Sequence, residues 1–186
     1  MPWIRMVDPE AADDELRVVY NRITGDRGKL STIMQVQSLS PRALTAHMDL
    51  YMATMFGPGG ITRPERELVA VVVSATNRCR YCVSHHAAAL QAYWKDEGRV
   101  AQVGEDWRAI EGLSARERAM LDYAEALTRE PSTVGRARIE AMRQAGLSDD
   151  DVLAVNLIVA YYNFVNRIAE GLGVEVEPEE VGGYNY

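Results

Sequence analysis

The sequence is poor in cysteine and phenylalanine, and it has no long hydrophobic run. Its 186 residues include two cysteines and two phenylalanines, and the longest unbroken apolar runs, 68–73 and 157–162, have six residues each. A disulfide-dense scaffold needs more cysteines, and a helix that crosses a bilayer needs roughly 20 apolar residues. We therefore expect neither a disulfide scaffold nor a transmembrane helix.

The sequence also has fewer basic than acidic residues. Lys and Arg total 20 against 27 Asp and Glu, so the formal net charge is −7, and the pI is near 5.0. Proteins that bind nucleic acids or anionic lipid surfaces through electrostatics need a basic patch. The composition predicts no nucleic-acid partner and no membrane partner.

What remains is the composition of an ordinary globular protein. Hydrophobic residues make up 47% and charged residues 25% of the chain, and this length favours one domain, with or without a helical appendage. The start of the chain bears on its location. The first residues show no basic segment followed by an apolar stretch, so we expect no signal peptide and a cytoplasmic location. Thiols are kept reduced there, which favours a catalytic or metal-binding role for two neighbouring cysteines.

Helix start and stop signals recur along the chain. The capping-box pattern, a hydroxyl residue followed three positions later by an acidic residue, occurs at Thr62, Ser114 and Ser148. Proline follows a cap residue at Pro9 and Pro41. Another helix is expected to carry Cys79 in its first turn. The expected helix ends lie near Gly25, Gly57, Gly98, Pro131, Gly146 and Gly171.

The apolar run 68–73 suits a buried strand as well as a buried helix, but the capping box before it favours the helix. The predicted fold class is therefore all-α. We expect an N-terminal helical extension at 1–39, a helical domain at 40–172, and a C-terminal tail at 173–186 that hangs free or docks on a neighbouring subunit. Several helices are apolar on all sides, which predicts a homo-oligomer.

Cys79 and Cys82 form a C-x-x-C motif at the expected start of a helix. One helical turn brings the two sulfur atoms close enough to form and break a disulfide. The unpaired N–H groups at a helix start favour a thiolate and lower the cysteine pKa from about 8.5. The motif predicts a redox-active pair with a partly ionised thiol.

His86 and Glu67 complete a possible relay. His86 follows Cys82 by four residues on the same helix face and can accept the thiol proton, whereas His85 is expected to point elsewhere. Glu67 precedes Cys79 by twelve residues, and a short helical hairpin would return it to His86. The spacing predicts a Cys–His–Glu relay that activates a sulfur nucleophile.

Other interpretations of these residues stay open. The C-x-x-C motif also fits half of a zinc site, with His47, His85, His86 and carboxylates as the further ligands, although no second cysteine pair exists. Both cysteines also fit inert buried residues, because the flanking segments resemble a core.

The pattern Glu67, Cys79-x-x-Cys82-x-x-x-His86 resembles the alkylhydroperoxidase AhpD-like branch of the carboxymuconolactone decarboxylase superfamily. The resemblance continues at 113–127, 145–149 and 163–167 and covers roughly residues 40–172. It implies an AhpD-like helical bundle that assembles into homo-oligomers. It also implies reduction of hydroperoxides in antioxidant defence, with no cofactor and no metal ion.

The resemblance also implies a role for each site residue. Cys82 matches the peroxidatic cysteine, which passes through sulfenic acid, and Cys79 matches the partner that closes the disulfide. Glu67 and His86 match members of the proton relay. A dithiol or lipoyl-type protein would be the reductant.

One position departs from the family pattern. Tyr81 stands between the cysteines where the best-characterised relay has a histidine, and a phenol with a pKa of about 10 is a poor base near neutrality. The relay here would have fewer members. Two alternatives therefore stand beside the peroxidase: a thiol–disulfide exchanger or stress sensor, and decarboxylase or lactone chemistry that does not use the cysteines.

Overall fold

The structure is a computed structural model that describes residues 2–185, and all regular elements in that range are helical. This confirms the all-α prediction. The longer helices are α1 (Asp14–Arg27), α3 (Pro41–Phe56), α4 (Arg63–Thr76), α5 (Arg80–Trp94), α6 (Glu97–Asp106), α7 (Ala115–Arg129), α8 (Arg136–Gln144) and α9 (Asp149–Leu172). The short ones are α2 (Thr32–Gln35), α10 (Pro178–Val181) and three 3-10 turns, Pro9–Ala11, Trp107–Ala109 and Pro131–Thr133.

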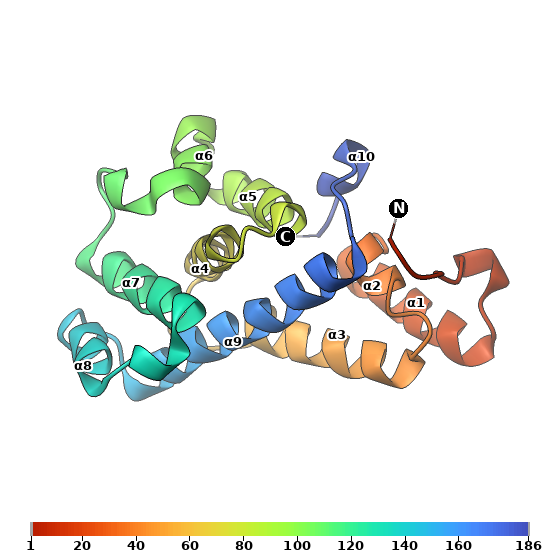
Figure 1. Ribbon diagram of the computed structural model, residues 1–186, viewed down its shortest axis with the longest axis horizontal. Coiled ribbons are helices and arrows are strands. Elements are labelled where there is room, and N and C mark those ends of the chain that lie inside the picture. Colours follow the sequence, from red (N-terminus) through yellow and green to blue (C-terminus); the bar gives the residue numbers. More distant parts are fainter. Residues whose placement is uncertain (1, 186) are drawn as a thin grey trace.

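Helix α4 lies at the centre of the molecule, packed against α5, α7 and α9 (Figure 1). Its apolar run 68–73 is at most 1% exposed, so the run is a buried helix and not a strand. The capping box that starts α4 is present: the Thr62 side chain accepts from the Glu65 N–H, and the Glu65 carboxylate accepts from Thr62 N–H.

Helix α9 runs through the length of the fold, from α8 to the terminal segments (Figure 1). It is the one helix within residues 2–185 whose length and composition would suit a membrane span, with a mean hydropathy of 1.3 in its most apolar window. Its inward residues Val155, Ile158 and Val159 are fully buried, and it packs against α3, α4 and α7. Burial in the core accounts for its apolar composition.

The first helix starts later and ends later than the sequence predicts. Pro9 begins only a single 3-10 turn, and α1 starts after Asp13, whose side chain accepts from the Leu16 N–H. Gly25 lies inside α1, and the helix ends at Gly28, which has a φ of 79°. A positive φ is easy for glycine, so Gly28 is the true stop signal.

The predicted helix from Cys79 to Gly98 is two helices. α5 ends at Trp94, where Lys95 adopts a left-handed conformation with a φ of 53°. The Asp96 side chain then accepts from the Arg99 N–H and starts α6. The capping boxes at Ser114 and Ser148 are both present at the starts of α7 and α9, as predicted.

The C-terminal tail docks on its own chain, which corrects the expectation that it hangs free, while a contact with a neighbouring subunit stays a prediction. Lys29 Nζ donates to the carbonyl oxygens of Glu179, Glu180 and Gly182 over 2.8–3.0 Å. The tail also pairs with the end of α1, because the Asn185 N–H donates to the Arg27 carbonyl oxygen over 3.0 Å. The tail thus covers one side of the α5 start.

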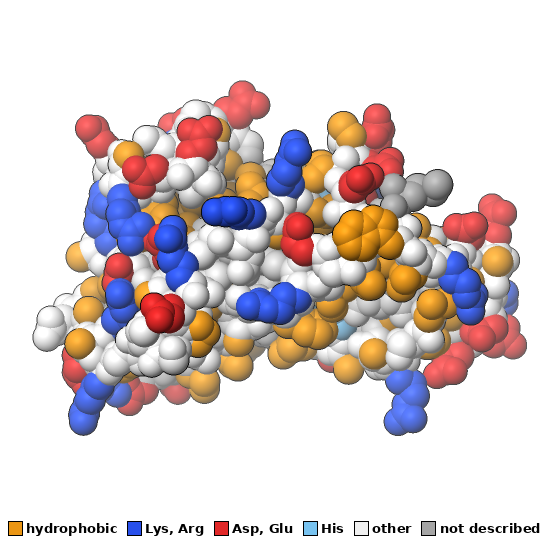
Figure 2. All heavy atoms as spheres, viewed as in Figure 1, with side chains coloured by type: hydrophobic (Ala, Val, Ile, Leu, Met, Phe, Trp, Pro, Cys, Tyr) orange, Lys and Arg blue, Asp and Glu red, His pale blue; other side chains and the backbone are white. Residues whose placement is uncertain are grey.

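Basic and acidic side chains are interspersed on the face drawn in Figure 2, and hydrophobic side chains gather over its lower middle, where α3 and α9 lie. Helices α3 and α9 carry several exposed apolar side chains, including Leu50, Leu157 and Phe164. The homo-oligomer stays a prediction.

Candidate active site

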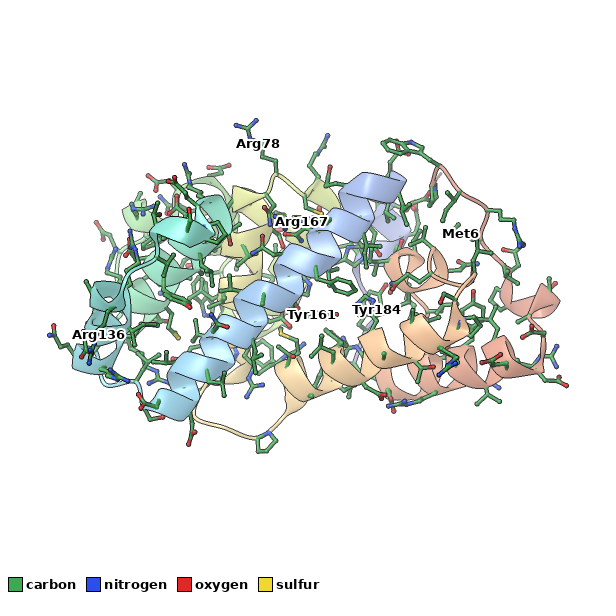
Figure 3. The ribbon with its side chains drawn as sticks, turned by 60° about the horizontal axis from the view of Figure 1, so that its bottom comes forward. Met6, Arg78, Arg136, Tyr161, Arg167 and Tyr184 are labelled. Atoms are coloured by element: carbon green, nitrogen blue, oxygen red, sulfur yellow. The ribbon has the colours of Figure 1, made fainter. Side chains whose placement is uncertain are left out.

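A cavity of about 80 Å³ lies between α1, α3, α4, α5, α9 and the C-terminal tail. Tyr161 from α9 and Tyr184 from the tail approach one another in the middle of the molecule (Figure 3), and both line the cavity. Among the predicted site residues, Glu67, Cys82 and His86 line it too. Cys79 is fully buried. Further residues that line the cavity include Arg27, Lys29, Tyr51, Arg63, Tyr81, His85 and Tyr162.

A tight turn positions the two cysteines. Arg78 takes a left-handed φ of 61° and points away from the fold (Figure 3). Cys79 follows as the N-cap of α5 and not in its first turn, and its N–H donates to the Ser74 carbonyl oxygen over 2.9 Å. Cys82 is then the third helical residue. Both thiols are free.

Buried amides hold this turn against α9. Asn166, which is 1% exposed, donates through Nδ2 to Ser74 Oγ over 3.1 Å and accepts from Asn77 Nδ2 over 2.9 Å. Asn77 Nδ2 also lies 3.1 Å from Asn163 Oδ1. These amides satisfy one another and tie the half-buried turn before Cys79 to α9.

The pKa of the Cys82 thiol is raised, contrary to the expectation that the helix start lowers it. Its hydrogen bond with Cys79 and its burial raise the pKa of Cys82 well above 9.0, and a hydrogen bond with Asn166 lowers it by less. Only 2% of Cys82 is exposed. The contact with Cys79 and burial both disfavour a charged sulfur at this position. Any thiolate chemistry at Cys82 therefore needs a base.

A histidine paired with a carboxylate lies in the same cavity. His86 Nδ1 is 2.6 Å from Glu67 Oε2, which agrees with the predicted approach of α4 and α5. Glu67 is fully buried, and its Oε1 lies 2.5 Å from Arg63 Nη2. The Tyr162 hydroxyl is 3.5 Å from His86 Nδ1. With Nδ1 held by Glu67, Nε2 is the ring nitrogen left to exchange a proton with a substrate or thiol.

The tail contributes a second polar cluster that sequence reasoning missed. The carboxylate of Glu180 accepts from Thr32 N–H over 2.7 Å and Thr32 Oγ1 over 2.6 Å, and from the Tyr81 hydroxyl. His85 Nε2 lies 3.6 Å away, so His85 faces the cavity, contrary to prediction. Burial alone would raise the pKa of Glu180, but His85, Thr32 and Tyr81 outweigh it and hold this pKa at about 2.

Tyr81 is consequently a hydrogen-bond donor and not a base. Burial and the Glu180 carboxylate raise the pKa of Tyr81 well above 10.0. The only signal of this contact in the sequence was the acidic, aromatic composition of the tail. A pairing between residues 99 positions apart follows no local spacing.

Nothing within residues 2–185 gathers three or more His, Cys, Asp or Glu side chains in an arrangement that could hold a metal ion. His47, one of the extra zinc ligands considered above, is instead bonded to Gln37 over 2.9 Å and to the Tyr161 hydroxyl over 2.8 Å. Burial lowers the pKa of His47 to about 4, so it is neutral near pH 7.

The sequence profile of the carboxymuconolactone decarboxylase family matches residues 41–126, a range that holds all four predicted site residues. A curated relative, the uncharacterized protein YdfG of Bacillus subtilis (strain 168), is 24% identical over 144 residues, which cover 77% of this chain and 96% of YdfG.

Two crystal structures share the fold over nearly the whole chain. One is the alkylhydroperoxidase AhpD core of an uncharacterized peroxidase-related protein from Ralstonia eutropha JMP134, with a TM-score of 0.87 and 28% identity; the match covers 97% of this chain and 94% of that one. The other is an uncharacterized peroxidase-related protein from Silicibacter sp. TM1040, with a TM-score of 0.86, 27% identity and the same coverage. The fold is AhpD-like.

Proposed function

We propose that this chain, which carries a carboxymuconolactone decarboxylase family domain in an AhpD-like fold, is a thiol-dependent peroxidase that reduces organic hydroperoxides or hydrogen peroxide. One observation carries the proposal. Two free thiols are hydrogen-bonded at the start of α5, and Cys82 shares a cavity with a histidine that is bound to a buried carboxylate.

The first step is the attack of Cys82 on the peroxide. His86 Nε2 takes the thiol proton, and the Cys82 sulfur bonds to the outer oxygen of R–O–O–H while the O–O bond breaks. The alkoxide leaving group takes a proton from His86 and departs as the alcohol. Cys82 is oxidised to sulfenic acid and the peroxide is reduced by the same two electrons. Glu67 is a positioning residue, because it acts through the ring of His86.

The second step returns the sulfenic acid to a form that can be reduced. The Cys79 thiol attacks Cys82 sulfur, a Cys79–Cys82 disulfide forms, and the hydroxyl group leaves as water. Disulfide formation before a second peroxide arrives prevents oxidation to sulfinic acid. A dithiol or lipoyl-type protein then reduces the disulfide by thiol–disulfide exchange and is itself oxidised to a disulfide.

Mass spectrometry of the reduced protein, before and after brief exposure to one equivalent of cumene hydroperoxide, tests both steps. We expect the wild type to lose two hydrogens within seconds, and Cys79→Ser to accumulate a dimedone-trapped sulfenic acid at Cys82. Cys82→Ser should stay reduced at Cys79 over the same time. If both wild-type thiols stay reduced for minutes, the peroxidase proposal is wrong.

After that negative result, two alternatives remain, and two further tests separate them. A thiol–disulfide exchanger or stress sensor would still exchange rapidly with a reduced dithiol protein without consuming peroxide. Decarboxylase or lactone chemistry would survive alkylation of both cysteines. The His86–Glu67 pair shares the cavity with Cys82 and supplies the base that its raised pKa requires, which supports the peroxidase.

A further inference from the structure

Arg27 of α1 is a buried cation without a carboxylate partner. Its exposed fraction is 7%, and no Asp or Glu among residues 2–185 forms an ion pair with it. Within residues 2–185 its side chain donates only to the Asn185 carbonyl oxygen, through Nη1, and its guanidinium lies over the rings of Tyr51, Phe56 and Tyr184 at 4.7–5.9 Å. Buried charges in proteins are normally paired, so Arg27 is a candidate group for binding an anion.

A second guanidinium lies close by. Arg63 sits 3.8 Å from the Phe56 ring centre, and Arg27 lies 4.7 Å from the same ring centre. Arg63 pairs with Glu67, but its Nε is buried and has no hydrogen-bond partner in the described part of the chain. Arg27 is buried and Arg63 half-buried, and an anion that contacts both guanidinium groups would offset the repulsion between them.

The lining of the cavity is positively charged. Arg27, Lys29 and Arg63 line it, and Glu67 is the single lining carboxylate among the described residues. Lys29 Nζ is bound to main-chain carbonyl oxygens of the tail, and Arg63 pairs with Glu67. Arg27 is therefore the lining guanidinium without a carboxylate, in a protein whose net charge is −7. A carboxylate suits this position, because a guanidinium can donate two parallel hydrogen bonds to its two oxygens.

We propose that Arg27 and Arg63 form a binding site for the carboxylate group of a small organic acid, whose other end reaches Cys82 and His86 in the same cavity. This deepens the function proposed above and rests on it: the preferred substrate is a hydroperoxide that also carries a carboxylate. The cavity of about 80 Å³ suits a short acid, since one water needs roughly 10–15 Å³ on this measure. Arg27 lies outside the matched range 41–126 and Arg63 inside it, so the site joins the N-terminal extension to the helical domain.

Calorimetry tests the site without any peroxide chemistry. The probe is 3-hydroxy-3-methylbutanoate, and its amide is the neutral control. We expect the wild type to bind the acid at least tenfold more tightly than the amide, Arg27→Gln to lose this preference, and Arg27→Lys to keep part of it. Arg22→Gln is the matched control, because Arg22 lies on the same helix but is exposed and pairs with Asp49 over 2.6 Å; it should bind as the wild type does.

Equal affinity for acid and amide in the wild type, or an equal loss in Arg22→Gln and Arg27→Gln, would overturn the proposal. Thermal unfolding of each variant shows whether Arg27→Gln is folded, and Arg27→Lys keeps the test valid if it is not.

Kinetics with a matched pair of peroxides link the site to the reaction. We expect Cys82 in the wild type to react with 3-hydroperoxy-3-methylbutanoate at least tenfold faster than with tert-butyl hydroperoxide, and this ratio to approach one in Arg27→Gln. Equal rates in the wild type would overturn the substrate class while leaving the peroxidase intact. If neither peroxide oxidises Cys82 but the acid binds through Arg27, the peroxidase is wrong and the carboxylate site stands.

Discussion

The two ends of the cavity are built differently. At one end, Cys82, His86 and Glu67 come from α4 and α5, inside the family domain at 41–126. At the other end, Arg27 and Tyr184 come from segments that lie outside it. The inner end carries the groups with redox and proton-transfer chemistry, whereas the outer end carries charge and covers the cavity. The proposed reaction thus uses residues of the matched range, whereas the proposed carboxylate site combines Arg63 of that range with Arg27 from outside it.

Neighbouring residues show the same contrast. Tyr81 and Cys82 are adjacent in α5, but Tyr81 donates to the Glu180 carboxylate, which stays ionised with a pKa of about 2. Cys82 faces another thiol, so its pKa is raised and it stays neutral. Burial disfavours charge at both Glu180 and Cys82. Only Glu180, which has several hydrogen-bond donors around it, keeps its charge.

After loss of the Cys82 thiol itself, the largest effect expected from a change at the inner end is that of Glu67→Gln. The variant leaves His86 without its carboxylate, so the rate constant for oxidation of Cys82 by peroxide should fall by about 10²–10⁴ and its pH dependence should change. Stopped-flow kinetics across a pH series measure both. A uniform drop with an unchanged pH profile would mean that Glu67 acts only on folding.

The next prediction concerns the thiol itself. The hydrogen bond with Cys79 is the largest cause of the raised pKa of Cys82, so Cys79→Ala should lower this pKa and speed alkylation of Cys82 by iodoacetamide at pH 7. The gain is about tenfold for each unit by which the pKa falls. Slower or unchanged alkylation would show that burial alone sets the reactivity of Cys82.

Glu180→Gln should act on stability more than on the chemical step. Losing the charged acceptor should cost about 1–3 kcal/mol in the free energy of unfolding. Because the pKa of Glu180 lies at about 2 and below its ordinary 4.5, the stabilisation is complete above pH 4.5 and disappears as the pH falls toward 2. Urea unfolding at several pH values measures the difference from the wild type.

Glu179→Gln is the matched control, since Glu179 is exposed and only its backbone carbonyl accepts, from Lys29. It should unfold as the wild type does. If Glu180→Gln slowed peroxide oxidation as much as Glu67→Gln, the division between the two ends of the cavity would be wrong.

The smallest effect is expected for Tyr81→Phe. It removes one donor to Glu180 and should cost about 1 kcal/mol of stability, while the rate of Cys82 oxidation stays within a few-fold of the wild type. The double variant with Glu180→Gln should cost less than the sum of the single changes, because both remove the same hydrogen bond. Additive costs would show that the two side chains do not interact.

Local signals predicted the inner end well. The capping box at Thr62 starts α4, and the spacing between Glu67 and His86 brings them to 2.6 Å, because both depend on one short hairpin. The direction of the Cys82 pKa shift was predicted wrongly. The helix start is visible in the sequence, but the contact with Cys79 and the burial that raise this pKa depend on the turn before α5 and on the packing around it.

The outer end could not be predicted from local patterns. Arg27 lies near the end of α1, and its unpaired charge is evident only once the neighbours from the rest of the fold are known. The docking of the tail depends on Lys29, which is 150 or more positions away from the carbonyls it binds. Neither contact has a characteristic spacing, so composition alone left the tail free or bound to another subunit.

The way Lys29 holds the tail affects how this segment can evolve. The ammonium group binds three main-chain carbonyl oxygens, which every amino acid supplies, so this contact does not depend on side-chain identity. Substitutions at Glu179 or Gly182 that keep the backbone path should be tolerated during evolution. An insertion or deletion between Val174 and Gly182 would shift all three oxygens at once. Among close homologues, the length of this segment should therefore be better preserved than its composition.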